Sequence, residues 1–203
     1  MFTIRNPVPA ESGIVSDLII ESDCGLLPAL FGAEVKALLS HLQTAVANPY
    51  SAENTLVAVQ AADPGPTAVV GALVGSLAGA GRNTHLHTAL LLFRWYGLEA
   101  FARFARLARA GKALDDLEVH DLYISHIAVL DRLRGGGVGS RLLLAAPEEP
   151  RNAGARRLVL DVDEQNEGAR AFYAHMDFQQ SSVVRIDLGA RGQFRFLRLV
   201  RDL

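Results

Sequence analysis

A run of glycines between an apolar segment and a helical segment is the clearest sign of chemistry in this 203-residue sequence. The run reads Arg134-Gly135-Gly136-Gly137-Val138-Gly139, and Ser140 follows it. Successive glycines let backbone N–H groups turn toward one point, and the beginning of a helix adds partial positive charge. The run therefore predicts a cradle for phosphate groups, with a plain tight turn between a strand and a helix as the alternative.

Two common nucleotide-binding motifs do not explain this loop. A Walker A motif needs Gly-Lys-Ser/Thr, which does not follow the glycines. A dinucleotide fingerprint needs a third glycine where Leu142 stands. A nucleotide-dependent oxidoreductase is therefore the function that we rank last.

The elements that must position the loop alternate between helical and strand-like patterns, which indicates a mixed α/β chain. Residues 10–48 predict two helices, and residues 55–60 and 68–76 predict a strand pair joined by a turn at 63–66. Further strands are expected at 122–130, 157–163, 183–188 and 194–200, and helices at 137–146 and 167–176. Pro147 and Pro150 predict that the first of these helices ends early or kinks.

Residues 88–113 predict an amphipathic helix that breaks at Gly97. We expect its apolar stripe to pack on the core and its basic side to face solvent. The stripe consists of Leu91, Trp95, Leu98, Phe101, Ala105 and Ala108, and the basic side of Arg103, Arg106, Arg109 and Lys112. A cover over an acceptor site and a homodimer contact are the alternatives.

Two motifs in the same order resemble the GNAT superfamily of acetyl-CoA-dependent N-acetyltransferases. Arg134-x-x-Gly137-x-Gly139, after the strand residues Ile127 to Leu130, is similar to the family signature Q/R-x-x-G-x-G/A. Residues 156–178 resemble the strand, Asn, Tyr-bearing helix and closing Phe that follow in the family. Asp177 replaces the usual Gly before Phe178, and its short side chain tolerates a left-handed backbone.

The resemblance implies an α/β (α+β) GNAT fold. Its central sheet is mixed and mostly antiparallel, is splayed between the fourth and fifth strands, and is flanked by helices. It also implies one N-acetyltransferase domain over residues 1–203, with a helical insertion at about residues 88–113.

The resemblance further implies that acetyl-CoA is the co-substrate and that no metal is needed. The backbone of the fourth strand would bond the pantetheine arm and polarise the thioester carbonyl, and the loop N–H groups would hold the pyrophosphate. Core packing for the strand residues and helix capping for Asn166 are the alternatives. The cofactor-binding residues that we expect are Ile127, Ala128, Val129, Arg134, Gly135, Gly136, Gly137, Val138, Gly139, Ser140, Asn166 and Tyr173.

Three residues are candidates for proton transfer. By resemblance, Tyr173 faces the sulfur of CoA and is the candidate general acid, with a core tyrosine as the alternative. Asp161 interrupts an apolar strand and is the first candidate for the base that deprotonates the amine, with pairing to an arginine as the alternative. His126 on the preceding strand is the second candidate, with a core histidine as the alternative.

Composition narrows the class of protein. A net charge of −2 and 50% hydrophobic residues favour one well-buried core and disfavour nucleic acid as a partner. Cys24 is the only cysteine, and the N-terminus lacks a signal-peptide pattern, so we expect a cytoplasmic protein without a membrane span.

The combined expectation is an enzyme that moves acetyl from acetyl-CoA to a primary amine by direct attack in a ternary complex. A sensor that binds acyl-CoA without turnover is the alternative. Small amines, amino acids, aminoglycosides and protein amines all stay open as acceptors, because the residues expected at the acceptor side match no motif.

Overall fold

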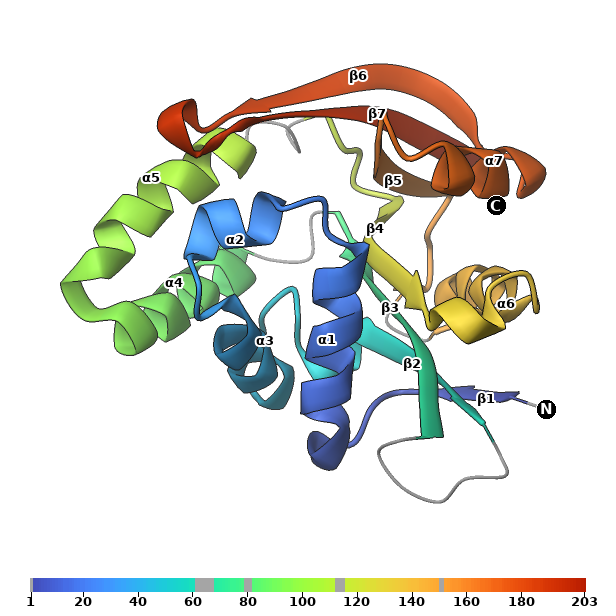
Figure 1. Cartoon of the computed structure of the whole chain (residues 1–203), viewed down its shortest axis with the longest axis horizontal. Coiled ribbons are helices and arrows are strands. Elements are labelled where there is room, and N and C mark those ends of the chain that lie inside the picture. The colour runs from blue at the N-terminus through green and yellow to red at the C-terminus, as the bar shows by residue number, and fades with distance from the viewer. Residues whose placement is uncertain (1, 61–67, 79–81, 112–115, 150–151) are drawn as a thin grey trace.

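A seven-stranded mixed sheet with the strand order β1-β2-β3-β4-β5-β7-β6 forms the centre of the protein (Figure 1). We describe it from a computed structural model, which places residues 2–60, 68–78, 82–111, 116–149 and 152–203. The strands are β1 (Phe2–Arg5), β2 (Thr55–Gln60), β3 (Val69–Leu77), β4 (Asp121–Val129), β5 (Arg157–Asp163), β6 (Gln179–Asp187) and β7 (Gln193–Asp202). The helices are α1 (Ser12–Ser22), α2 (Leu26–Phe31), α3 (Val35–Thr44), α4 (Arg82–Tyr96), α5 (Ala100–Gly111), α6 (Val138–Ala145) and α7 (Glu167–His175).

The sheet opens between its fourth and fifth strands. These strands pair in parallel only where Asp121 to Ile124 meet Arg157 to Leu160, although β4 continues to Val129. The other neighbouring pairs are antiparallel. The predicted fold class, a mixed and mostly antiparallel sheet that splays between the fourth and fifth strands, is thus confirmed.

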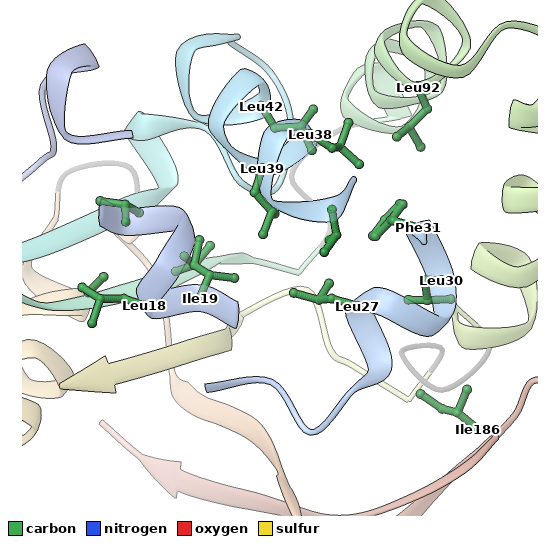
Figure 2. Packing of buried hydrophobic residues seen from close by; sticks show 14 of the residues in the cluster. Leu18, Ile19, Leu27, Leu30, Phe31, Leu38, Leu39, Leu42, Leu92 and Ile186 are labelled. Atoms are coloured by element: carbon green, nitrogen blue, oxygen red, sulfur yellow. The ribbon is translucent and has the colours of Figure 1, made fainter. Parts of the chain in front are cut away.

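Alternating side chains give the sheet two packed faces. Along β5, Leu158, Leu160 and Val162 point to the face that α6 and α7 cover. The opposite face packs against α1, α2 and α3, whose buried residues recur at helical spacing, as Leu38, Leu39 and Leu42 do in α3 (Figure 2). Helices α4 and α5 lie on the side of α2 and α3, away from α6 and α7 (Figure 1).

Most of the predicted elements are present, with differences near the N-terminus. The segment 10–48 holds three helices rather than two, because Gly32 has a φ of 90° and ends α2. Strand β1 was not predicted, since four residues give little periodicity. Helix α6 ends at Ala145, before Pro147, as the proline predicts. The predicted turn at 63–66 and Pro150 lie outside the described residues.

The helical segment before β4 breaks as predicted but packs with its other side inward. Gly97 has a φ of 57° and separates α4 from α5. The predicted stripe is wrong for most of its residues: Leu98 and Phe101 are 79% and 62% exposed, although Leu91 packs against the core as predicted. Leu92, Tyr96, Phe104, Leu107 and Ala110 make the core contacts instead, and the guanidinium of Arg103 lies over the Tyr96 ring. The apolar residues occupy several sides of these helices, so spacing alone did not identify the packed one.

Candidate active site

A pocket of about 1870 Å³ passes through the opening between β4 and β5. One end is lined by the glycine loop and α7, which belong to one side of the sheet. The other end is lined by α2, α4 and α5, which belong to the opposite side. The pocket is therefore continuous from one face of the sheet to the other.

Three positions of the glycine loop favour glycine, two because of their backbone conformation and one because there is little space for a side chain. Gly135 and Gly137 have φ values of 77° and 78°, in the left-handed region that L side chains rarely adopt. A Cβ on Gly139 would lie 3.2 Å from Cζ of Phe172 on α7. These glycines let the backbone turn into α6 and let α6 approach α7 closely.

Most N–H groups of this loop are free to bind an anion. The N–H groups of Gly135, Gly137, Val138, Gly139 and Ser140 donate to no acceptor within the described part of the chain. The last three form the first turn of α6, where the helix dipole adds positive charge. The loop could thus hold an anion such as a phosphate.

Two predicted loop residues behave differently from the rest. The N–H of Gly136 donates to the carbonyl of Leu133 at 3.2 Å, and Gly136 is not among the lining residues. Arg134 lines the pocket, and its guanidinium bonds the Val129 carbonyl and forms a 2.7 Å ion pair with Asp131. The Gly136 N–H therefore stabilises the turn and is not available to a ligand. Arg134 contributes positive charge, which Asp131 partly balances.

The end of β4 presents backbone groups to the opening. The N–H of Leu130 donates to Val70 on β3 at 3.0 Å. Because backbone polar groups of an antiparallel strand alternate in direction, those of Ala128 also face β3, and those of Ile127 and Val129 face the opening. Ile127 and Val129 can therefore bond a ligand by strand addition, whereas Ala128 contributes its side chain to the lining.

Tyr173 on α7 and Asn166, the residue just before α7, lie on the pocket wall. The Tyr173 ring packs against Phe172 and Phe178, at centroid distances of 5.2 and 5.6 Å. Burial raises the pKa of Tyr173 above its usual value, so the phenol keeps its proton. The Asn166 side chain caps α7 by accepting from the N–H of Ala169 at 3.0 Å, which is the alternative that the sequence left open.

Asp161 lies in a buried hydrogen-bonded group. Both of its oxygens accept hydrogen bonds of 2.9 Å from Arg198 on β7, and one of them also accepts from the Tyr123 hydroxyl at 3.1 Å. The pairing with an arginine, left open by the sequence, is therefore present. Asp161 nevertheless lines the pocket, as does Tyr123, so a ligand can approach this group.

His126 lies on the same side of β4 as Tyr123. Its ring nitrogens contact the Ser22 hydroxyl at 3.3 Å and the Tyr50 hydroxyl at 3.4 Å. Burial lowers the pKa of His126 to about 4, so the ring is neutral near pH 7. A neutral imidazole can accept a proton, but this lowered pKa makes it a weak base.

A bulge in β4 brings Tyr123 and His126 to one face. The register with β3 shifts between Val74 and Gly75, which leaves Ser125 as an extra residue. Leu122 and Ile124 before the bulge, and Ile127 and Val129 after it, accordingly pack toward α6 and α7. Strict alternation would have put Tyr123 and His126 on opposite faces.

Sequence reasoning missed three residues of this site: Tyr123, Tyr50 and Arg198. A polar ring inside the apolar pattern of 122–130 was a signal for Tyr123. The isolated arginine in Phe196 to Val200 was a signal for Arg198, since a buried arginine needs an anionic partner. Tyr50 carries no local signal, because a loop places it against His126.

Among the described residues, no three His, Cys, Asp or Glu side chains are grouped so that they could hold a metal ion. In the same part of the chain, no helix combines the length and apolarity needed to cross a membrane.

Comparison with known proteins identifies the family. The chain is 30% identical over 76 residues to N-alpha-acetyltransferase 30 of Schizosaccharomyces pombe, a match that covers 37% of this chain and about half (51%) of that protein. Two solved structures share the fold. One is an acetyltransferase (TM-score 0.66, 23% identity, 98% of each chain covered) and the other an N-acetyltransferase from Staphylococcus aureus Mu50 (TM-score 0.64, 16% identity, 98% and 100% covered). The model of the acetyltransferase (GNAT) family matches residues 48–178, which include the glycine loop, β5 and α7. Because this match covers more than half of the sequence, the chain belongs to the GNAT family of acetyltransferases, which use acetyl-CoA and transfer acetyl groups to amines.

Proposed function

We propose that this chain is an N-acetyltransferase that moves acetyl from acetyl-CoA to a primary amine by direct attack within a ternary complex. One observation carries the proposal. A continuous pocket joins the free N–H groups of the glycine loop to Tyr173 and Asp161 through the opening of the sheet. Donor and acceptor can thus enter from opposite faces and meet between β4 and β5, which favours direct transfer over a covalent intermediate.

The glycine loop fits the pyrophosphate of acetyl-CoA. The free N–H groups of Gly135, Gly137 and the first turn of α6 supply donors around one concave surface. The outward-facing backbone groups of Ile127 and Val129 would hold the pantetheine arm. One of their N–H groups would then polarise the thioester carbonyl and stabilise the negative charge that develops on its oxygen.

Proton transfer is assigned to groups on the two sides of the opening. The amine needs to lose a proton, and we propose that the Asp161–Tyr123 pair accepts it, either at Asp161 or through the Tyr123 hydroxyl. His126 is the second candidate, because it borders the same part of the pocket. The leaving thiolate needs a proton or hydrogen bond, and the phenol of Tyr173 supplies it.

The arrangement is also consistent with one domain over residues 1–203, in which α4 and α5 form an insertion before β4. Their residues Leu92, Phe104 and Leu107 pack into the same cluster as α2 and α3. Both sides of the pocket are then parts of one packed unit, so movement of the insertion would change the acceptor end directly.

The test is release of free CoA thiol when the protein is mixed with acetyl-CoA and a panel of primary amines. We expect thiol release that depends on the amine and saturates with both substrates, with convergent lines in a double-reciprocal analysis. Tight binding of acetyl-CoA without thiol release for any amine would instead support the alternative, a sensor without turnover. A ping-pong pattern would contradict direct attack.

A further inference from the structure

The acceptor end of the pocket is built from apolar side chains. Among the described residues, those that α2, α4, α5, β6 and β7 contribute to the lining are all apolar apart from Thr88. They include Leu30, Phe31, Leu92, Phe104, Leu107 and Ile186. Figure 2 shows Leu30 and Phe31 of α2 between Leu92 of α4 and Ile186 of β6. A charged group placed here would lose its hydration without gaining a partner.

None of the five described carboxylates that line the pocket, Glu21, Asp23, Glu53, Asp161 and Asp163, belongs to α2, α4, α5, β6 or β7, and Glu53 already accepts from the N–H of Ala47 and the hydroxyl of Ser51. Burial and the negative charges of Asp23 and Asp163 raise the pKa of the Cys24 thiol, and burial and Asp23 raise the pKa of Tyr50, whose hydroxyl contacts His126. Asp161 lies in the same central region beside Tyr123. Because Arg198 balances the charge of Asp161, Asp23 and Asp163 supply the negative charge that favours an ammonium group at the centre of the pocket.

Among the described lining residues, Arg134 is the one arginine or lysine, and it stands on the glycine loop beside Asp131. His126 is neutral near pH 7, because burial lowers its pKa to about 4. A carboxylate attached next to the acceptor amine would therefore meet Asp23 and Asp161, and the guanidinium beside Asp161, that of Arg198, is already paired with it. This arrangement opposes free amino acids as acceptors.

Building on the proposed function, we infer that the acceptor is a primary amine that carries an apolar body and no carboxylate beside the amine. The amine lies near Asp23, Tyr123 and Asp161, and the apolar body fills the space between α2 and α5. A free aryl-alkyl amine and the N-terminus of a peptide with a large apolar first residue share this chemistry. Polyamines and agmatine do not, because their second cation would lie in the apolar end.

The test compares kcat/KM for five acceptors at one pH: phenethylamine, phenylalaninamide, a peptide amide that begins with Phe, free phenylalanine and agmatine. We expect each of the first three to exceed phenylalanine and agmatine by at least about tenfold, since these two bring an unpaired charge into the pocket. If kcat/KM is higher for the peptide amide than for phenethylamine, the acceptor is a polypeptide N-terminus. If it is higher for phenethylamine, the acceptor is a small amine.

A matched pair of variants tests the position of the apolar body. Phe104→Asp places a carboxylate in the apolar end, whereas Phe101→Asp places it on the exposed side of the same helix. We expect Phe104→Asp to lower kcat/KM for phenethylamine by at least about tenfold and to raise kcat/KM for agmatine. Phe101→Asp should leave kcat/KM for both amines unchanged. Leu107→Asp repeats the test if Phe104→Asp unfolds, and KM for acetyl-CoA reports an intact fold.

Two outcomes separate this inference from the function on which it rests. Faster acetylation of free phenylalanine or agmatine than of the apolar amines would overturn the inference and leave the proposed function standing. Binding of acetyl-CoA without thiol release for any of the amines would reject the proposed function and the inference with it.

Discussion

Arg198 on β7 and Asp161 on β5 face each other at one register position of the sheet and form two hydrogen bonds of 2.9 Å. Their side chains are only 4% and 9% exposed, so the pair is almost completely withdrawn from water. The arginine keeps the carboxylate in one orientation, with one oxygen directed at the Tyr123 hydroxyl. The pair therefore links β5 to β7 and holds the Asp161 carboxylate at the pocket, where the proposed reaction needs a proton acceptor.

The first prediction concerns the stability of this pair. Arg198→Met leaves a buried carboxylate without its cation, and Asp161→Leu leaves a buried cation without its carboxylate, so each should lower the free energy of unfolding by about 3 kcal/mol or more. The double variant should lose less than either single variant, because no buried charge remains. Urea unfolding at pH 7 measures all three. Losses that simply add in the double variant would show that the two side chains do not interact.

The second prediction concerns the glycine loop. Gly137→Val should abolish binding of acetyl-CoA, because valine disfavours the φ of 78° and its side chain would displace the loop N–H groups. Gly154→Val is the matched control, since Gly154 has a φ of 91° but does not line the pocket. Calorimetric titration should show lost affinity in the first variant and retained affinity in the second. Equal affinity in both would remove the loop from the binding site.

The third prediction concerns the general acid. Tyr173→Phe should keep the fold and the affinity for acetyl-CoA, because the ring still packs against Phe172 and Phe178. It should lower kcat by roughly 10- to 1000-fold through loss of the proton donor. Tyr96→Phe removes a hydroxyl from a partly buried ring that does not line the pocket and should change kcat little. Unchanged kcat in Tyr173→Phe, with chemistry rate-limiting, would contradict the role.

The fourth prediction concerns stability at acidic pH. Burial lowers the pKa of His126 to about 4, so the unfolded chain binds a proton more tightly than the folded chain. Stability is therefore complete above pH 6.5 and falls as the pH drops toward 4, by about 3 kcal/mol in all from this group. In His126→Gln the loss of unfolding free energy between pH 7 and pH 5 should be smaller than in the unsubstituted chain. His175→Gln, at an exposed position, should leave that loss unchanged, and equal losses in all three chains would refute the assignment.

The parts of the site that depend on local sequence could be predicted. The glycine loop, α6, β5 and α7 follow one another closely, and their glycines, apolar alternation and caps act over a few residues. Asp177 was expected to accept a left-handed backbone, and its φ is 63°. The order of these elements was enough to predict the family, the fold class and the opening of the sheet.

The parts that depend on tertiary packing could not be predicted. The bulge at Ser125 changes which face Tyr123 and His126 share, and alternation within β4 contains no sign of it. The packed side of α5 depends on contacts with α2 and β6, so Phe104 and Leu107 were missed while exposed Leu98 and Phe101 were assigned to the core. Arg198 lies 37 positions after Asp161, and only the pairing of β5 with β7 brings the two together.

The last prediction identifies the base. An alkylamine with a pKa of about 10 is almost entirely protonated at pH 7, so loss of the base matters most there and least under alkaline conditions. Asp161→Asn should lower kcat/KM by roughly 100-fold at pH 7 and recover part of it near pH 9.5. Because this variant also disturbs Arg198, Tyr123→Phe serves as a second test that leaves the Asp161–Arg198 pair in place. It should show the same pH-dependent loss if the proton passes through the hydroxyl. His126→Gln should have a smaller effect at every pH. A severe loss in His126→Gln, with Asp161→Asn and Tyr123→Phe nearly normal from pH 6.5 to 9.5, would move the base to the imidazole.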